Sequence, residues 1–259
     1  MKRARMLSSV AVAILIGIGC GSGKPQDASA TTPSNDTPAE TQPVAGGGSA
    51  SIRGTVKLSG TAPTMGKIKM DADPVCQQQH SSPVYTEDVV VNGQGMLKNV
   101  FVYVKEGAPS SATTPTTPVT LNQSGCWYAP HIFGIQTNQP LEIVNSDATL
   151  HNINAKPTVN QPFNIAQPVK GMKTDKKFAK PEIMVTFKCN VHPWMHAYAG
   201  VLDHPFFNVS DADGSFTIGG LPAGTYVVEA WHEKYGAQTQ KVIVADGESK
   251  AVEFTFNAQ

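Results

Sequence analysis

Four residues whose side chains can bind a soft metal ion lie in two short segments of the chain. Cys189, His192 and Met195 fall within seven residues, so one compact loop can direct a thiol, an imidazole and a thioether at one point. His151 lies 38 residues before Cys189, just after an apolar run typical of a strand. Two imidazoles, a thiolate and a weakly bound thioether are the ligands of copper in electron-transfer sites. The sequence therefore predicts a mononuclear copper centre.

Zinc is the alternative metal for the same loop. Cys189, His192 and His196 form a Cys-x2-His-x3-His pattern, and His151 could supply a fourth zinc ligand. This arrangement leaves Met195 without a role, so copper is favoured. A dinuclear purple copper centre would need a second cysteine in the loop, and the His-x-His repeats of multicopper oxidases are absent from the sequence. We therefore expect a protein that is not an enzyme.

Most of the chain after residue 50 consists of short runs of β-branched and aromatic residues separated by turn residues. Several runs alternate apolar and polar residues, and no stretch of about a dozen residues keeps a helical spacing without Pro or Gly. The expected strands are residues 52–58, 89–91, 100–104, 132–136, 141–145, 183–187, 216–218, 226–231, 241–244 and 252–256. This pattern predicts an all-β fold of packed antiparallel sheets.

Residues 118–203 resemble the cupredoxins. The Cys-x2-His-x2-Met loop, with Pro193 after the histidine, resembles that of amicyanin, and Asn145-Ser-Asp-x3-His-Asn resembles the first ligand strand of plastocyanin. The resemblance implies a Greek-key β-sandwich that holds one type 1 copper ion. It also implies that Asn152 ties the ligand loops together and orients the thiolate. The ligands implied are His151, Cys189 and His192 in the equatorial plane and Met195 on the axis.

The resemblance further implies an electron carrier. In this family the histidine of the ligand loop reaches the surface through an apolar patch, so a redox partner protein is expected to dock near His192, Pro193 and Trp194. Two other functions stay open. One is a copper-binding or copper-delivery protein for metalloenzyme assembly, and the other is a structural surface protein with a vestigial metal site.

Two cysteines lie outside both the copper loop and the first twenty residues. Cys76 and Cys126 form a disulfide if the chain works in an oxidising compartment. A second metal site is the alternative, because Cys76-x3-His80 and Cys126-x4-His131 each pair a thiol with an imidazole. Single histidines are more often structural or on the surface, and this is the expected role of His204 and His232.

Residues 211–232 resemble the carboxypeptidase-regulatory or transthyretin-like β-sandwich, which has an Ig-like architecture. This segment carries an Asp-Gly turn followed by two strands joined by a Gly/Pro turn. The strands that normally precede the Asp-Gly turn are missing from residues 204–210. Residues 52–58 and 97–104 have the pattern of these missing strands.

This distribution predicts a discontinuous second sandwich. Residues 51–108 and 204–259 would form it together, and the copper domain, residues 109–203, would be inserted between them. The alternative is a tandem in which residues 51–203 form one enlarged copper domain. Residues 107–118 are rich in Pro, Ser and Thr and are expected to be a linker or a long loop.

The chain begins with a pattern typical of a secretory signal peptide, residues 1–20. Lys2, Arg3 and Arg5 precede an apolar run, residues 7–18, that is too short to span a bilayer comfortably. The run ends at Cys20 and resembles a bacterial lipobox, which implies lipidation of this cysteine. Membrane contact is then expected through the lipid anchor only.

Residues 21–50 contain few large apolar residues and are expected to be a disordered tether. Gly21 follows the lipidated cysteine, and in a Gram-negative host this residue, unlike Asp, favours the outer membrane. The expected location is therefore periplasmic or at the cell surface.

The charge balance excludes one class of partner. The chain has 20 basic and 20 acidic side chains, and removal of residues 1–19 leaves 17 basic against 20 acidic, a net charge of −3. A mildly acidic protein has no basic excess to bind nucleic acid.

Overall fold

A computed structural model describes residues 47–109 and 113–258, which belong to one compact unit, residues 42–259. The predicted signal peptide, the lipidation site Cys20 and most of the tether lie outside the described residues, as do residues 110–112 of the expected linker. Within the described part of the chain, no helix combines the length and apolar character needed to cross a membrane.

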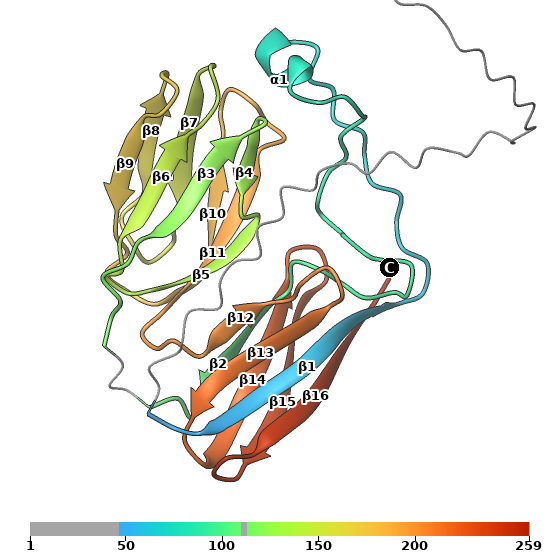
Figure 1. The fold of residues 1–259 in the computed structure, drawn as a ribbon, viewed down its shortest axis with the longest axis vertical. Coiled ribbons are helices and arrows are strands. Elements are labelled where there is room, and N and C mark those ends of the chain that lie inside the picture. Colours follow the sequence, from blue (N-terminus) through green and yellow to red (C-terminus); the bar gives the residue numbers. More distant parts are fainter. Residues whose placement is uncertain (1–46, 110–112, 259) are drawn as a thin grey trace, which may run out of the picture. The chain divides into compact units, whose positions relative to one another are not determined.

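A first β-sandwich combines strands from both ends of the described chain (Figure 1). One sheet has the strand order β13-β1-β16 and the other the order β12-β2-β14-β15. Its core is lined by alternate residues, as in β16, where Phe254 and Phe256 are buried between exposed neighbours. The strands are β1 (Ala50–Ser59), β2 (Phe101–Glu106), β12 (Phe207–Val209), β13 (Ser215–Leu221), β14 (Gly224–His232), β15 (Gly236–Val244) and β16 (Ser249–Asn257).

A second β-sandwich is formed by the continuous stretch between β2 and β12. Its sheets have the orders β5-β11-β10-β7-β8 and β4-β3-β6-β9. Buried aromatic side chains, among them Tyr128, Phe133, Phe178 and Phe187, pack between the two sheets. The strands are β3 (Val119–Ser124), β4 (Trp127–Ala129), β5 (Ile132–Gln136), β6 (Leu141–Asn145), β7 (His151–Lys156), β8 (Phe163–Gln167), β9 (Lys173–Lys176), β10 (Glu182–Lys188) and β11 (His196–Leu202).

The predicted all-β class with two sandwiches is confirmed, and the two central runs 132–136 and 141–145 are strands over those residues. The expected strand at 89–91 is wrong, because this run makes only an isolated bridge between Val91 and Leu97. Strands that were not expected include β7 and β11. Both carry polar or small residues that hide the alternation, such as Asn152 and Asn154 in β7.

Residues 61–90, which we call the cap segment, pack against both sandwiches. Val89 is buried in the core of the first sandwich and Met65 packs against that core, whereas Ile68, Met70 and Cys76 pack into the core of the second sandwich. The segment contains the helix α1 (Pro74–Gln78), which begins after the N-cap Asp73, whose carboxylate accepts from the backbone N–H of Val75 at 2.8 Å.

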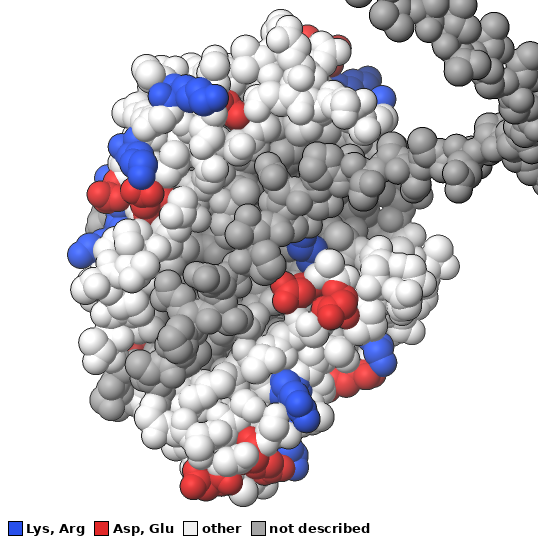
Figure 2. All heavy atoms as spheres, viewed as in Figure 1, with Lys and Arg blue, Asp and Glu red and all other residues white. Residues whose placement is uncertain are grey.

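Charged side chains are dispersed over the described surface in Figure 2, where Lys and Arg lie interspersed with Asp and Glu. No large patch of one sign is visible among the described residues on this face.

Candidate metal centre

Three of the predicted ligands converge at one end of the second sandwich. β7 and β10 pair antiparallel as far as Asn154 and Lys188, so Cys189 leaves β10 beside the start of β7, where His151 lies. The Nδ1 atoms of His151 and His192 are 3.0 Å apart, and Cys189 Sγ lies 3.9 Å from His192 Nδ1. All three side chains are buried. The geometry thus brings two imidazole nitrogens and a thiol to one point.

The loop between β10 and β11 is closed by its own backbone. The N–H of Cys189 donates to the carbonyl of Met195 at 3.1 Å, and the N–H of Met195 donates to the carbonyl of His192 at 2.9 Å. The N–H of His192 points at Cys189 Sγ at 3.4 Å. Met195 is fully buried in the same core cluster as Cys189. The spacing of three residues therefore produces the compact turn that the sequence predicted.

Each imidazole ring contacts a carboxylate through its Nε2 atom. His151 Nε2 lies 2.9 Å from Asp147 Oδ2, and His192 Nε2 lies 3.0 Å from Asp73 Oδ2. If each Nε2 donates to its carboxylate, each neutral ring carries its lone pair at Nδ1. Two lone pairs that face each other at 3.0 Å beside a thiolate repel one another unless a cation lies among them. The donor set therefore fits a soft or borderline metal ion.

Asp147 connects His151 to the turn between β3 and β4. Its two carboxylate oxygens accept from the backbone N–H groups of Gly125 at 2.9 Å and Cys126 at 2.8 Å. Burial raises the pKa of Asp147, but the hydrogen bonds from His151 and from these two backbone groups outweigh it and lower the pKa below its ordinary value. The carboxylate stays ionised and fixes the orientation of the His151 ring.

Asn152 joins β7 to the ligand loop. Its Oδ1 accepts from the N–H of Asn190 at 2.5 Å, and its Nδ2 donates to Asn164 Oδ1 at 2.5 Å. Burial raises the pKa of Cys189, but when the rings of His151 and His192 are protonated, their hydrogen bonds and those of the backbone lower it to about 5. The pocket therefore favours the thiolate, which is the form that binds metals.

The cap segment covers the second imidazole. Cys76 and Cys126 are joined in a disulfide, and Cys76 Sγ lies 3.5 Å from His192 Nε2. His192 is only 2% exposed. The expectation that this histidine reaches the surface is therefore wrong, because Asp73 and the disulfide lie over its outer edge. Trp194 is half-buried and donates from Nε1 to the carbonyl of Cys126 at 3.0 Å.

The remaining predicted histidines lie elsewhere. His196 points away from Cys189 and contacts Glu233 at 3.3 Å, so the Cys-x2-His-x3-His arrangement for zinc does not assemble. His80 lies 2.7 Å from the carbonyl of Gly125, and the disulfide removes the thiol that its alternative metal site required. His204 and His232 are buried and lie outside the candidate metal clusters of the described residues.

Two residues of the site, Asp73 and Asp147, were not predicted. Asp147 lies inside the Asn-Ser-Asp motif, so a search for a partner of His151 four residues earlier could have found it. Asp73 is 119 residues from His192, and its only sequence signal is the Asp-Pro pair typical of a helix start. That signal indicates a cap residue and not a partner of a metal ligand.

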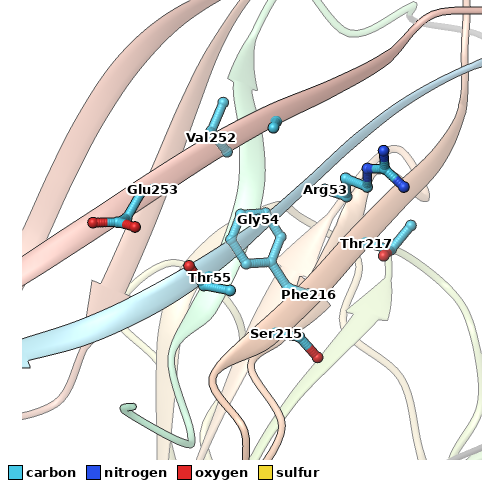
Figure 3. A pocket seen from close by; sticks show the side chains of 9 residues that line it. Arg53, Gly54, Thr55, Ser215, Phe216, Thr217, Val252 and Glu253 are labelled. Atoms are coloured by element: carbon cyan, nitrogen blue, oxygen red, sulfur yellow. The ribbon is translucent and has the colours of Figure 1, made fainter. Parts of the chain in front are cut away.

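A hollow of about 520 Å³ on the first sandwich is unrelated to this site (Figure 3). Residues of β1, β13 and β16 line it, and the Phe216 ring lies across Gly54, where a Cβ atom would come within 2.8 Å of the ring. Its described lining contains no histidine or cysteine. We assign it no metal chemistry.

Comparison with known proteins identifies one family in part of the chain. The model of the carboxypeptidase regulatory-like domain matches residues 206–257, which confirms that predicted resemblance. Comparison with curated protein sequences gives no match.

Several solved structures are similar to part of the chain. A Cu-containing nitrite reductase from Thermus scotoductus SA-01 is 25% identical over 38% of this chain and 25% of its own length, with a TM-score of 0.29. A purple cupredoxin from Nitrosopumilus maritimus is 18% identical over 32% of this chain and 97% of its own, with a TM-score of 0.28. The oxidised state of a proline-to-alanine mutant of amicyanin is 16% identical over 32% of this chain and 81% of its own, with a TM-score of 0.29. The chain thus spans a quarter of the nitrite reductase.

Proposed function

We propose that this protein is an electron carrier with one copper ion bound by His151, Cys189, His192 and Met195. The observation that carries the proposal is the pair of Nδ1 atoms 3.0 Å apart beside a buried thiol, with both rings anchored at Nε2 by carboxylates. Copper, when bound by such a set, accepts and releases single electrons. The protein is proposed to be a carrier and not an enzyme.

The residues around the ligands suit that task because they resist rearrangement. Asp147 ties His151 to the β3–β4 turn, and Asn152 ties β7 to the ligand loop. Buried ligands exclude water, and a site whose ligands stay in place needs little reorganisation when its charge changes by one. The hydrogen bond from the His192 N–H to Cys189 Sγ stabilises the negative charge of the thiolate.

Retention of the metal is more consistent with this arrangement than delivery. A delivery protein must expose its metal to an acceptor, whereas His192 is covered by a segment that a disulfide fastens to the second sandwich. Removal of copper would require displacement of Asp73 and of the disulfide from the outer edge of the ring. We therefore favour the carrier over the copper-delivery protein.

The docking surface for a redox partner protein is proposed at the exposed residues beside the ligands. Leu150 precedes His151, and Val191 and Pro193 flank His192. All three flanking side chains are exposed. Exposed apolar side chains around a buried redox centre let a partner approach and exclude water without strong binding. Electrons would then reach the copper through the residues that flank His192, because the ring of His192 itself is buried.

The location is proposed to be outside the cytoplasm, at a membrane surface. The Cys76–Cys126 disulfide is typical of proteins from oxidising compartments. Lipidation of Cys20 and the tether of residues 21–50 would hold the copper centre at the periplasmic or outer cell surface.

The visible spectrum of the copper-loaded full chain tests the function. Oxidised protein is expected to be blue or green, because a thiolate bound to Cu(II) absorbs strongly in the visible. Cys189→Ser should abolish the band, whereas Val191→Ser, an exposed change in the same loop, should keep it. A colourless wild-type protein that contains stoichiometric zinc would overturn the proposal.

A further inference from the structure

A second group of metal-binding side chains lies outside the copper centre. His131 directly precedes β5, and His196 begins β11, which pairs in parallel with β5. Glu233 directly follows β14 of the first sandwich. The rings of His131 and His196 lie 4.9 Å apart between centroids, and both face Glu233. Three strands thus bring two imidazoles and a carboxylate together.

The Nε2 atoms of both rings converge on the carboxylates. His131 Nε2 contacts Glu233 Oε1 directly, and His196 Nε2 lies 3.3 Å from Glu233 Oε2. Asp88 of the cap segment contributes a second carboxylate, whose Oδ1 is 3.5 Å from His196 Nε2. The ligand atoms of His131, His196 and Glu233 all lie within 4.8 Å of one another. A single ion placed among them could contact all three.

The hydrogen bonds of the two Nδ1 atoms determine which nitrogen of each ring can bind a cation. His131 Nδ1 lies 3.2 Å from the carbonyl of His196, and His196 Nδ1 lies 3.0 Å from the carbonyl of Trp194. A carbonyl oxygen only accepts hydrogen bonds, so both Nδ1 atoms carry hydrogen. In the neutral rings the lone pairs then lie at Nε2. Metal-binding histidines are usually held in this way, with the other nitrogen donating to a carbonyl or carboxylate.

The group is partly buried but can be reached from solvent. The side chains of His131 and Glu233 are 3% and 8% exposed, whereas those of His196 and Asp88 are 18% and 42% exposed. The carboxylate of Glu233 therefore has a largely desolvated face toward the rings, and ions can enter from the side of Asp88.

We propose that His131, His196 and Glu233 form a second binding site for a divalent transition-metal ion, which Asp88 can complete. Two nitrogen and two oxygen donors are a set that Zn²⁺ accepts in tetrahedral and Cu²⁺ in tetragonal geometry. The site contains no thiolate, so a metal bound there adds no strong visible band. His196 directly follows Met195, so consecutive residues serve the two metal sites. The inference does not depend on the proposed electron transfer.

The competing explanation for the cluster is an ion pair without metal, in which protonated imidazoles neutralise Glu233. Both explanations require the carboxylate, so loss of stability in a variant does not distinguish them. Metal content does, because only a metal site binds an additional equivalent of ion.

The test is a zinc titration of the full chain after its thiolate site has been loaded with copper. Bound zinc is measured by elemental analysis after gel filtration, while the visible band reports on the Cys189 site. We expect one zinc ion per chain in the wild type and an affinity lower by roughly tenfold or more in Glu233→Gln and in His131→Gln. The matched control is Glu229→Gln, a buried carboxylate of the adjoining strand β14, which pairs with Tyr103 and Lys105 and should bind zinc like the wild type.

A second arm uses excess Cu²⁺ in place of zinc. A tetragonal Cu²⁺ signal in electron paramagnetic resonance, absent in Glu233→Gln, would support the site and identify copper as a second possible occupant. Equal zinc binding by the wild type and Glu233→Gln would overturn the proposal, as would zinc uptake that removes the visible band in proportion. Because the comparison between wild type and Glu233→Gln needs no visible band, a protein without a blue copper centre would still give a decisive result.

Discussion

The disulfide between Cys76 and Cys126 provides the most direct test of how the cap segment is held. The perturbation is the double variant Cys76→Ala/Cys126→Ala, which removes both sulfur atoms and therefore adds no free cysteine that could bind metal. Both side chains are fully buried, and one lies 3.5 Å from His192. The variant removes the only disulfide between the cap segment and the second sandwich in the described residues.

The magnitude follows from the length of chain that the disulfide closes. The two cysteines are 50 residues apart, and a cross-link over a loop of this length lowers the entropy of the unfolded chain by an amount worth about 4 kcal/mol. We expect the free energy of unfolding to fall by about this amount. For a protein of this size, that corresponds to a decrease in the midpoint of thermal unfolding of roughly 8–16 °C.

Urea unfolding of the metal-free full chain, followed by circular dichroism, measures the change. Wild-type protein whose disulfide has been reduced serves as a control and should behave like the double variant. The copper-loaded variant should keep its visible band, because Cys189 and His151 are held by Asn152 and Asp147. The argument that the disulfide constrains the unfolded chain would be refuted if the free energy of unfolding fell by less than about 1 kcal/mol while its slope against urea concentration stayed unchanged.

Four further predictions concern single side chains. Asp147→Asn should lower copper affinity by roughly 10- to 100-fold in competition with a chelator, because the amide cannot replace the carboxylate behind the His151 ring, whereas Asp175→Asn on the exposed strand β9 should not. Met195→Leu should raise the reduction potential and keep the visible band, since an apolar axial neighbour disfavours Cu(II). Burial raises the pKa of Glu182, but hydrogen bonds from Thr158 and Asn160 lower it to about 2, so its stabilisation is complete above pH 4.5 and is lost as the pH falls toward 2. Glu182→Gln should therefore flatten the pH dependence of the urea midpoint in that window, and a variant curve as steep as the wild type would contradict this. Val191→Asp should slow electron exchange with the partner without changing the spectrum, and unchanged exchange would place the docking surface elsewhere.

The residues of the candidate metal centre could be named from the sequence because most of them lie in one short loop. Cys189, His192 and Met195 share one loop, and few functions other than metal binding explain that spacing. The fold class could also be predicted, since the alternation of apolar and polar residues that is typical of strands recurs along the chain. Strands β7 and β11 were missed because polar residues in β7, such as Asn152 and Asn154, and small residues in β11, such as Ala197 and Gly200, hide the alternation that marks a strand.

The environment of the ligands could not be predicted, because it comes from distant segments. Asp73 reaches His192 across 119 residues, and Glu233 reaches His131 across 102. Such pairs leave no local pattern, since each residue is an ordinary helix cap or strand end in its own segment. The exposure of His192 was inferred wrongly for the same reason: the residues that cover it lie in a segment that no motif connects to the copper loop.

The order of the strands explains how the cap segment comes to lie over His192. The chain leaves the first sandwich at the end of β1, forms the cap segment, returns to the first sandwich as β2, and only then enters the second sandwich at β3. Cys76 therefore precedes the second sandwich in sequence but bonds to Cys126 in the turn between β3 and β4. That same turn donates two backbone N–H groups to Asp147, the partner of His151. One short turn thus contacts the cap segment on one side and the carboxylate that orients His151 on the other, so displacement of the cap segment should change the positions of both imidazoles.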